Sequence, residues 1–163
     1  MRHSFKFTII SIFLTAACAA WAAEDPNLLQ LATCQQSWLD WKQDPEKVET
    51  FRAQFKAGYV ANGNDGSFVP RVPTSLHGQN VSRVFPQSVG MGVGYSVVVD
   101  AGFDATKRAL VKQIGKPFEH CAKTEGVQMC EHTIGPKKTI ILTEATLGKS
   151  PQTMVGCYYY YEK

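Results

Sequence analysis

Two mirrored tripeptides, Glu119-His120-Cys121 and Cys130-Glu131-His132, limit how the C-terminal part of this chain can fold. Between them, Glu125-Gly126 predicts a two-residue turn that joins two antiparallel strands. In this register Cys121 faces Cys130 at a non-hydrogen-bonded position, where opposite side chains lie closest. The spacing therefore predicts a hairpin closed by a disulfide. A bulge at Gly126 is the alternative, and it would shift the register by one residue.

Residues 1–22 are predicted to form a secretory signal peptide. A basic start is followed by the apolar stretch 7–14, which is too short to cross a bilayer as a helix. Ala20 and Ala22 fit the small-residue rule for cleavage after Ala22. We therefore expect residues 23–163 to form a single exported domain, periplasmic or secreted. A retained N-terminal anchor helix is one alternative.

A lipid anchor at Cys18 is a second alternative for the N-terminus. The segment Thr15-Ala16-Ala17-Cys18 approximates the motif in which a cysteine is acylated after export. Acylation there would make the protein an outer-membrane lipoprotein. Because Thr15 occupies a position where that motif usually carries leucine or valine, we expect simple cleavage instead.

Loss of the signal peptide leaves four of the five cysteines. An even number of cysteines in an exported chain predicts two disulfides, for which three pairings exist. With Cys121 joined to Cys130, Cys34 pairs with Cys157 by elimination. That long-range bridge would tie the first helix to the last strand.

A zinc site is the rival interpretation of the mirrored tripeptides. Glu119, Cys121, Cys130 and His132 share one face of the predicted hairpin, and two thiolates, an imidazole and a carboxylate can hold Zn²⁺. An oxidising compartment favours the disulfide over free thiolates. We therefore expect neither a metal nor a cofactor.

The charge of the mature chain argues against nucleic acid as a partner. Removing Arg2 and Lys6 leaves 15 basic and 14 acidic side chains, so the net charge falls to +1. A nearly neutral chain without a basic run lacks the electrostatic footprint of a nucleic-acid binder. No apolar stretch after residue 22 is long enough for a transmembrane helix, so none is expected in the mature chain.

The distribution of helix and strand signals predicts an α+β fold. Residues 26–58 read as an N-terminal helical hairpin, in which Asp44 caps the second helix and Pro45 opens it. A long loop is expected over 60–80. The segment 81–163 is expected to form an antiparallel sheet of about five to six strands, with one inserted helix over 104–114. Asp104 is its expected N-cap and Gly115 its stop.

Three alternate glycines precede and enter one of the predicted strands. Gly90, Gly92 and Gly94 do not form a dinucleotide-binding fingerprint, because that motif follows a strand and opens a helix. On a strand, alternate glycines indicate close packing of another backbone or of an aromatic ring.

No catalytic signature is present, so we do not expect an enzyme. After export only His77, His120 and His132 remain as histidines. The sequence contains no nucleophile elbow, no zinc-protease motif and no phosphate-binding loop. The cysteines are expected to be bridged, which removes them as nucleophiles.

The loop over 60–80 is the predicted partner-contacting segment, because a loop this long in a small domain is often functional. A plain linker is the alternative. The candidate contact residues are Asn62, Asn64, Asp65, Phe68, Arg71 and His77. Together these features predict an exported protein-binding module of the inhibitor or immunity type that acts on another envelope protein. The alternatives are a structural envelope protein or lipoprotein, and a metal-binding periplasmic protein.

Overall fold

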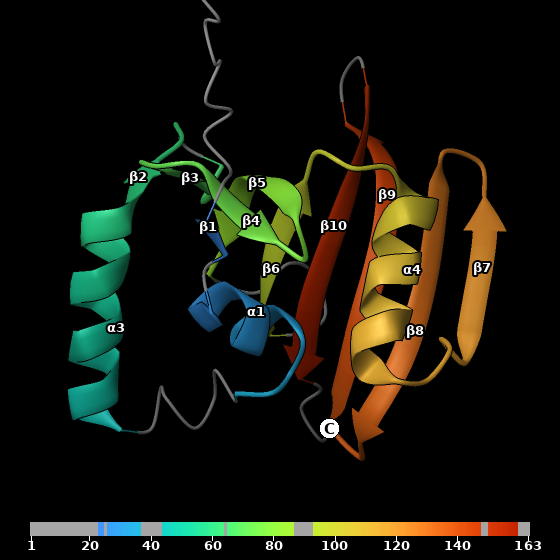
Figure 1. Ribbon diagram of the computed structural model, residues 1–163, viewed down its shortest axis with the longest axis horizontal. Helices are drawn as coiled ribbons and strands as arrows, with labels where there is room; N and C mark the ends of the chain where they lie inside the picture. Colours follow the sequence, from blue (N-terminus) through green and yellow to red (C-terminus); the bar gives the residue numbers. More distant parts are fainter. Residues whose placement is uncertain are drawn as a thin grey trace, which may run out of the picture.

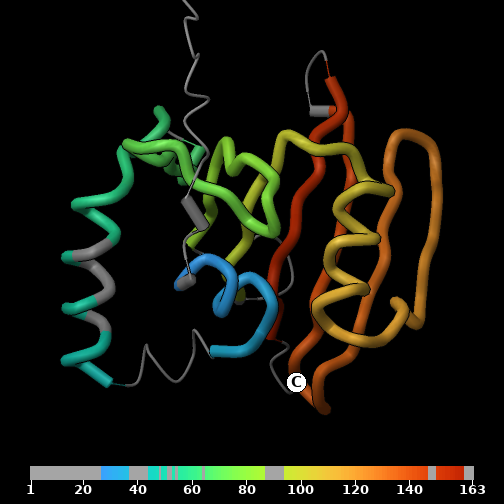
Figure 2. The backbone as a smooth tube through the Cα atoms, in the orientation of Figure 1, coloured from blue at the N-terminus to red at the C-terminus, as the bar shows by residue number. Residues whose placement is uncertain are grey.

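The computed structural model describes residues 23–24, 26–36, 44–63, 65–86, 93–147 and 150–159 (Figure 1 and Figure 2). The expected signal peptide, Cys18 and Asn64 lie outside these residues. The N-terminal elements are β1 (Ala23–Glu24), α1 (Pro26–Ala32), α3 (Pro45–Gly58), β2 (Tyr59–Ala61), β3 (Phe68–Pro70), β4 (Thr74–Leu76) and β5 (Gln79–Phe85). They are followed by β6 (Val93–Val99), α4 (Phe103–Ile114), β7 (His120–Thr124), β8 (Val127–Gly135), β9 (Lys138–Leu147) and β10 (Ser150–Tyr159).

Among the described residues, one sheet of ten strands is the main structural element. Its main order is β1-β4-β5-β6-β10-β9-β8-β7, and β3 joins β2 to β5 beside this path. All pairs are antiparallel except β1 with β4. The expectation of five to six strands was wrong, and so was the loop over 60–80, which contains β2, β3 and β4. These strands have three residues each, too few to show the alternation that marks a strand in sequence.

The register separates the sheet into two faces. One face carries a row of completely buried side chains across four adjacent strands, namely Val97, Val155, Leu142 and Cys130. We call this the covered face. The opposite row consists of Val98, Met154, Thr143 and Met129, and it defines the open face. Helices α1 and α4 both lie in front of the covered face, and no described helix lies over the open one (Figure 1).

The expectation of an N-terminal helical hairpin was wrong, because the described residues of this region, 26–36 and 44–58, do not form one. Helix α1 has only seven residues and buries Leu28 and Leu31 against the sheet instead of against a second helix. It stops before Cys34, which has a left-handed φ of 60°. Helix α3 stands apart from α1 and contacts β2 (Figure 1). The apolar residues that suggested two helices packed on each other therefore pack against strands instead.

The C-terminal end of helix α3 packs against the neighbouring strands. Its Phe55 ring stacks on Tyr59 with centroids 4.4 Å apart and meets Phe68 edge-on at 4.8 Å. At its other end Asp44 is the N-cap, as expected, and accepts hydrogen bonds from the backbone N–H groups of Glu46 and Lys47. These N–H groups, that of Lys47 foremost, lower the pKa of Asp44.

The inserted helix is confirmed at α4, one residue longer than predicted. Gly115 ends it with a left-handed φ of 74°, as expected. Asp104 is not the N-cap, because Gly102 holds that position and offers no side chain. The carboxylate of Glu144 on β9 instead accepts from the backbone N–H of Phe103 at 3.3 Å. A neighbouring strand thus supplies the acceptor that the helix itself lacks.

Within the described residues, two disulfides join the elements. Cys121 and Cys130 face each other in the register expected for the hairpin, with Cα atoms 4.1 Å apart. Cys34 is bonded to Cys157, which fastens the end of α1 to β10 across 123 residues of sequence. Because Cys157 lies on the covered face, this second bridge also fixes α1 over the core.

Candidate functional site

A cavity of about 460 Å³ lies on the open face, where β5, β6, β9 and β10 run side by side. Its apolar lining comes from Phe85, Val98, Ala145 and Met154. Its polar lining comes from Asp65, Arg83, Thr143 and Gln152. A concave, mostly apolar site with a few converging polar groups is the usual form of a binding pocket.

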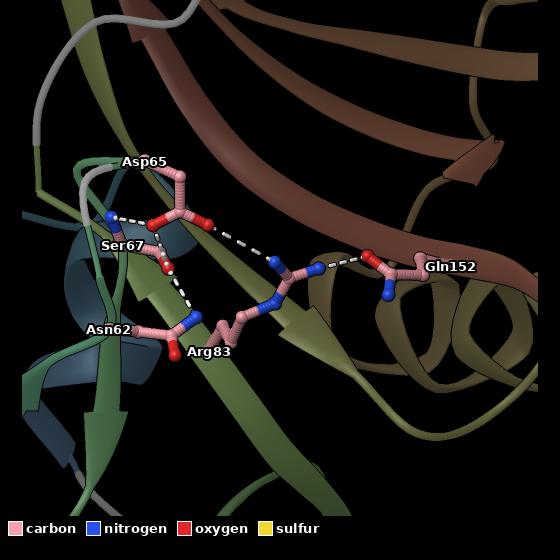
Figure 3. Close-up of polar contacts among 5 residues, drawn as sticks. All are labelled: Asn62, Asp65, Ser67, Arg83 and Gln152. Carbon is pink, nitrogen blue, oxygen red and sulfur yellow. Dashed lines mark hydrogen bonds and ion pairs between the residues drawn. The ribbon is translucent and has the colours of Figure 1, made fainter. Parts of the chain in front are cut away.

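Arg83 is the centre of the polar side of this cavity. Its guanidinium donates to Asp65 Oδ2 at 3.4 Å and to the side-chain oxygen of Gln152, so it connects β5 to β10 across β6 (Figure 3). The guanidinium carbon also lies 5.8 Å from the centroid of the Phe85 ring. With its side chain only 22% exposed, Arg83 is fixed in position by these contacts.

The turn between β2 and β3 positions Asp65. Asp65 Oδ1 accepts from the backbone N–H of Ser67 at 2.9 Å and from its hydroxyl at 2.6 Å. Asn62 Nδ2 in turn donates to the Ser67 hydroxyl at 3.2 Å. This is the local side-chain to backbone bonding for which aspartate is favoured in turns. The Ser67 hydroxyl first, then its N–H and the charge of Arg83, hold the pKa of Asp65 below its usual range.

A register shift in β5 turns Arg83 towards the cavity. Val81 pairs with Val99 and Arg83 with Val98, so Ser82 is an extra residue on the β5 side. Without this bulge, Val81 and Arg83 would point to the same face of the sheet. With it, Val81 enters the core while Arg83 reaches the open face.

A second cavity of about 400 Å³ adjoins the first and shares Val98 and Gln152 with it. Its walls include the turn over 100–102 and the start of β10. Glu144 lines it at the N-terminus of α4, where its carboxylate accepts from Phe103 N and from the Thr153 hydroxyl. A helix N-terminus attracts an anion, and here the Glu144 carboxylate of the protein itself occupies that position.

The structure brings together two of the described residues that the sequence analysis named. Asn62 and Asp65 belong to the same turn, which lies beside the cavity. Phe68 packs edge-on against Phe55, and Arg71 is exposed, with its backbone N–H bonded to Gly58. His77 lies in the turn between β4 and β5 and has a φ of 53°. This turn precedes the start of β5, whereas Phe85 is the last residue of that strand.

The mirrored tripeptides form a site of another kind. Glu119 Oε1 lies 3.3 Å from His132 Nδ1, as their shared face predicts. The backbone N–H of Thr133 donates to Glu119 at 3.1 Å and is the main cause that lowers the pKa of that carboxyl, with His132 contributing. The two sulfurs needed for the rival zinc set are bonded to each other, so this hairpin does not offer two thiolates.

Sequence reasoning missed most of the cavity. Arg83, Gln152 and the apolar lining residues come from four strands, and only the bulge in β5 sends Arg83 to the right face. The one usable signal was Asp65, because an Asn/Asp/Gly-rich turn between short apolar segments predicts a fixed carboxylate.

Comparison with protein-family models, with curated proteins and with solved structures gives no match. Among the residues that the structure describes, no helix is both long and apolar enough to cross a membrane.

Proposed function

We propose that this chain is an exported periplasmic module that binds another protein of the envelope, of the inhibitor or immunity type and without catalysis. Its binding site is the cavity on the open face, into which the partner inserts one apolar side chain. The observation that carries this proposal is the cavity itself, about 460 Å³ in volume and lined by an apolar floor beside a fixed arginine.

The chemistry of the lining defines what fits. Val98, Ala145 and Met154 offer apolar surface, which favours an aliphatic or aromatic anchor. Arg83 uses two of its N–H groups on Asp65 and Gln152, and a guanidinium carries five. The remaining donors favour a partner carbonyl beside the anchor. Since Asp65 already balances the charge of Arg83, the site suits a neutral segment of protein.

The two disulfides support the exported location. Bridges of this kind persist in oxidising compartments such as the periplasm. They also keep a small domain rigid, which lowers the entropy that ordering costs on binding. A rigid sheet with a preformed cavity is well suited to block or escort a partner protein.

Filling the cavity tests the proposal. Ala145→Trp places a large ring in the cavity, whereas Thr133→Trp places the same ring on an exposed position of β8, on the same face but outside the cavity. Tagged versions would be recovered from the envelope fraction after mild crosslinking. We expect Ala145→Trp to lose a partner that both the wild type and Thr133→Trp retain, at equal melting temperature. Retention of that partner by Ala145→Trp would contradict the proposal.

A further inference from the structure

The two disulfides differ sharply in their access to solvent. Cys34 and Cys157 are 4% and 0% exposed, beneath the end of α1. In the other bridge Cys130 is completely buried, but Cys121 lies on β7, a strand whose five residues are all exposed. Among the strands that the structure describes, β7 is the outermost at its end of the sheet and pairs with β8 alone (Figure 1). A reagent in solution can therefore reach one sulfur of one bridge.

A lysine lies directly beside that accessible sulfur. Lys107 of α4 donates from its Nζ to Cys121 Sγ at 3.3 Å. An ammonium group at this distance stabilises a thiolate, and neighbouring lysines are one of the features that make a cysteine reactive. The contact comes from a separate element, so it is not a consequence of the hairpin alone.

We propose that Cys121–Cys130 is a thiol–disulfide exchange site for small thiols, with Cys121 as the sulfur that is attacked and Cys130 as the resolving sulfur. Cys34–Cys157 remains a permanent structural bond. This inference does not depend on the binding function proposed above, because it concerns the covered face and the β7 edge and not the cavity.

The exchange proceeds in two balanced steps. The thiolate of a small thiol attacks Cys121 Sγ, the bond to Cys130 breaks, and the Cys130 sulfur leaves with the electron pair and takes up a proton. A second thiol then attacks the small-molecule sulfur of the mixed disulfide and releases Cys121 as a thiolate beside Lys107. In total, two thiols are oxidised to one small disulfide, and the protein bridge is reduced to two thiols.

The geometry also favours the reverse direction. Once reduced, Cys121 is the exposed thiolate held beside an ammonium, so it reacts first with an oxidised small disulfide. Cys130 is directly opposite in the register, with its Cα 4.1 Å away, and can then close the bridge again. This exposed nucleophile paired with a buried resolving thiol is the arrangement that reversible exchange needs.

Selective reduction of the wild-type protein tests the proposal without any variant. Folded protein would be treated with reduced glutathione, quenched with an alkylating agent, and mapped by mass spectrometry. We expect label on Cys121 and Cys130 and a glutathione adduct on Cys121, while Cys34 and Cys157 stay bridged. Simultaneous opening of both bridges, or earlier opening of Cys34–Cys157, would overturn the proposal.

The role of Lys107 needs a matched pair of variants. Cys130→Ser frees Cys121 as a single thiol, and Lys107→Ala or Lys112→Ala would be added to it, since both lysines lie on α4. We expect Lys107→Ala to slow alkylation of Cys121 at neutral pH by about fivefold, as loss of a charge pair at the surface implies. Lys112→Ala should leave the rate unchanged. Equal rates in the two variants would remove Lys107 from the mechanism.

Discussion

At the scale of single residues, the centre of the sheet depends on two glycines. A Cβ atom added at Gly94 would lie 2.1 Å from the carbonyl oxygen of Cys157, a distance that no packing arrangement tolerates. A Cβ at Gly156 would lie 2.8 Å from the Tyr158 ring. Gly94 therefore lies at a close approach of another backbone, as expected from the alternate-glycine pattern, while Gly90 and Gly92 lie outside the described residues.

Substitution of Gly94 by alanine should strongly destabilise the protein. The backbone of β10 must move away from β6, and overpacking of this kind costs roughly 1–3 kcal/mol or more. Gly58→Ala is the matched control, because a Cβ there meets nothing within 4 Å and the residue ends α3. Urea denaturation should show a large fall in the midpoint for Gly94→Ala and none for Gly58→Ala. Equal urea midpoints for the two variants would show that β10 does not approach Gly94 this closely.

Asp65 should make stability depend on pH. Its pKa is lowered in the folded protein, so its contribution is fully present above the unfolded-state value near 3.9 and is lost as the pH falls through the folded value. Asp65→Asn should therefore destabilise the protein equally at pH 7 and pH 5, and by less at pH 3. Urea denaturation at the three values measures the difference. If the stability difference between the wild type and Asp65→Asn stays constant down to pH 3, the lowered pKa of Asp65 is refuted.

Ser67→Ala tests the cause of that shift. The Ser67 hydroxyl is the main group that lowers the pKa of Asp65, while its backbone N–H would remain in the variant. The loss of stability between pH 5 and pH 3 should therefore be smaller in Ser67→Ala than in the wild type. The same titration in urea provides the comparison.

At the scale of the elements, the hairpin and the helix boundaries follow local rules. Asp44 with Pro45 opens α3, and Gly115 closes α4, because caps and stops are decided by neighbouring residues. The β7–β8 register follows from one turn, Glu125-Gly126, and from the two cysteines that face each other. These features could be predicted from sequence because each involves only a few adjacent residues.

Other elements could not be predicted, for equally physical reasons. Strands β2, β3 and β4 have three residues each, and their identity depends on partners elsewhere in the sheet. The bulge at Ser82 decides which residues of β5 reach the open face, and no turn-forming residue in the sequence indicates this bulge. The apolar residues of α1 were assigned to a helix pair, but they pack on the sheet.

The N-terminus of α4 gives a prediction at this scale. Gly102 provides no capping side chain, and Glu144 on β9 accepts from Phe103 N instead. Glu144→Ala should destabilise the protein by about 1 kcal/mol, the usual contribution of a cap. Adding Gly102→Ser should recover part of this loss, since a Cβ at Gly102 meets nothing within 4 Å. If the double variant is no more stable than Glu144→Ala, the loss does not come from a missing cap at the N-terminus of α4.

At the scale of the whole molecule, the two disulfides contribute differently. Cys34–Cys157 closes a loop over 123 residues of sequence, whereas Cys121–Cys130 spans nine. Chain entropy assigns up to ~4.9 kcal/mol to the first bridge and ~2.7 kcal/mol to the second. Paired cysteine-to-alanine variants, measured by urea denaturation, should follow this order. A larger loss of stability on removal of Cys121–Cys130 would mean that fixing β7 contributes more to the stability of the fold than fixing α1.

The candidate site is also a property of the whole molecule. Asp65 and Arg83 are 18 residues apart in sequence, and Arg83 and Gln152 are 69 apart. Their meeting requires the complete strand order from β5 through β6 to β10. Of the cavity, the sequence could therefore indicate only Asp65, because that side chain is fixed by its own turn.

A photocrosslinking measurement in the envelope tests the binding function most directly. A photoreactive amino acid would replace Thr143 in the cavity or, in a second variant, Lys112 on the exposed side of α4. The proposal predicts a crosslinked protein partner from position 143, lost when Ala145→Trp is added, and no such product from position 112. A product from position 112 alone, or from neither position, would contradict the assignment of the open face as the binding surface.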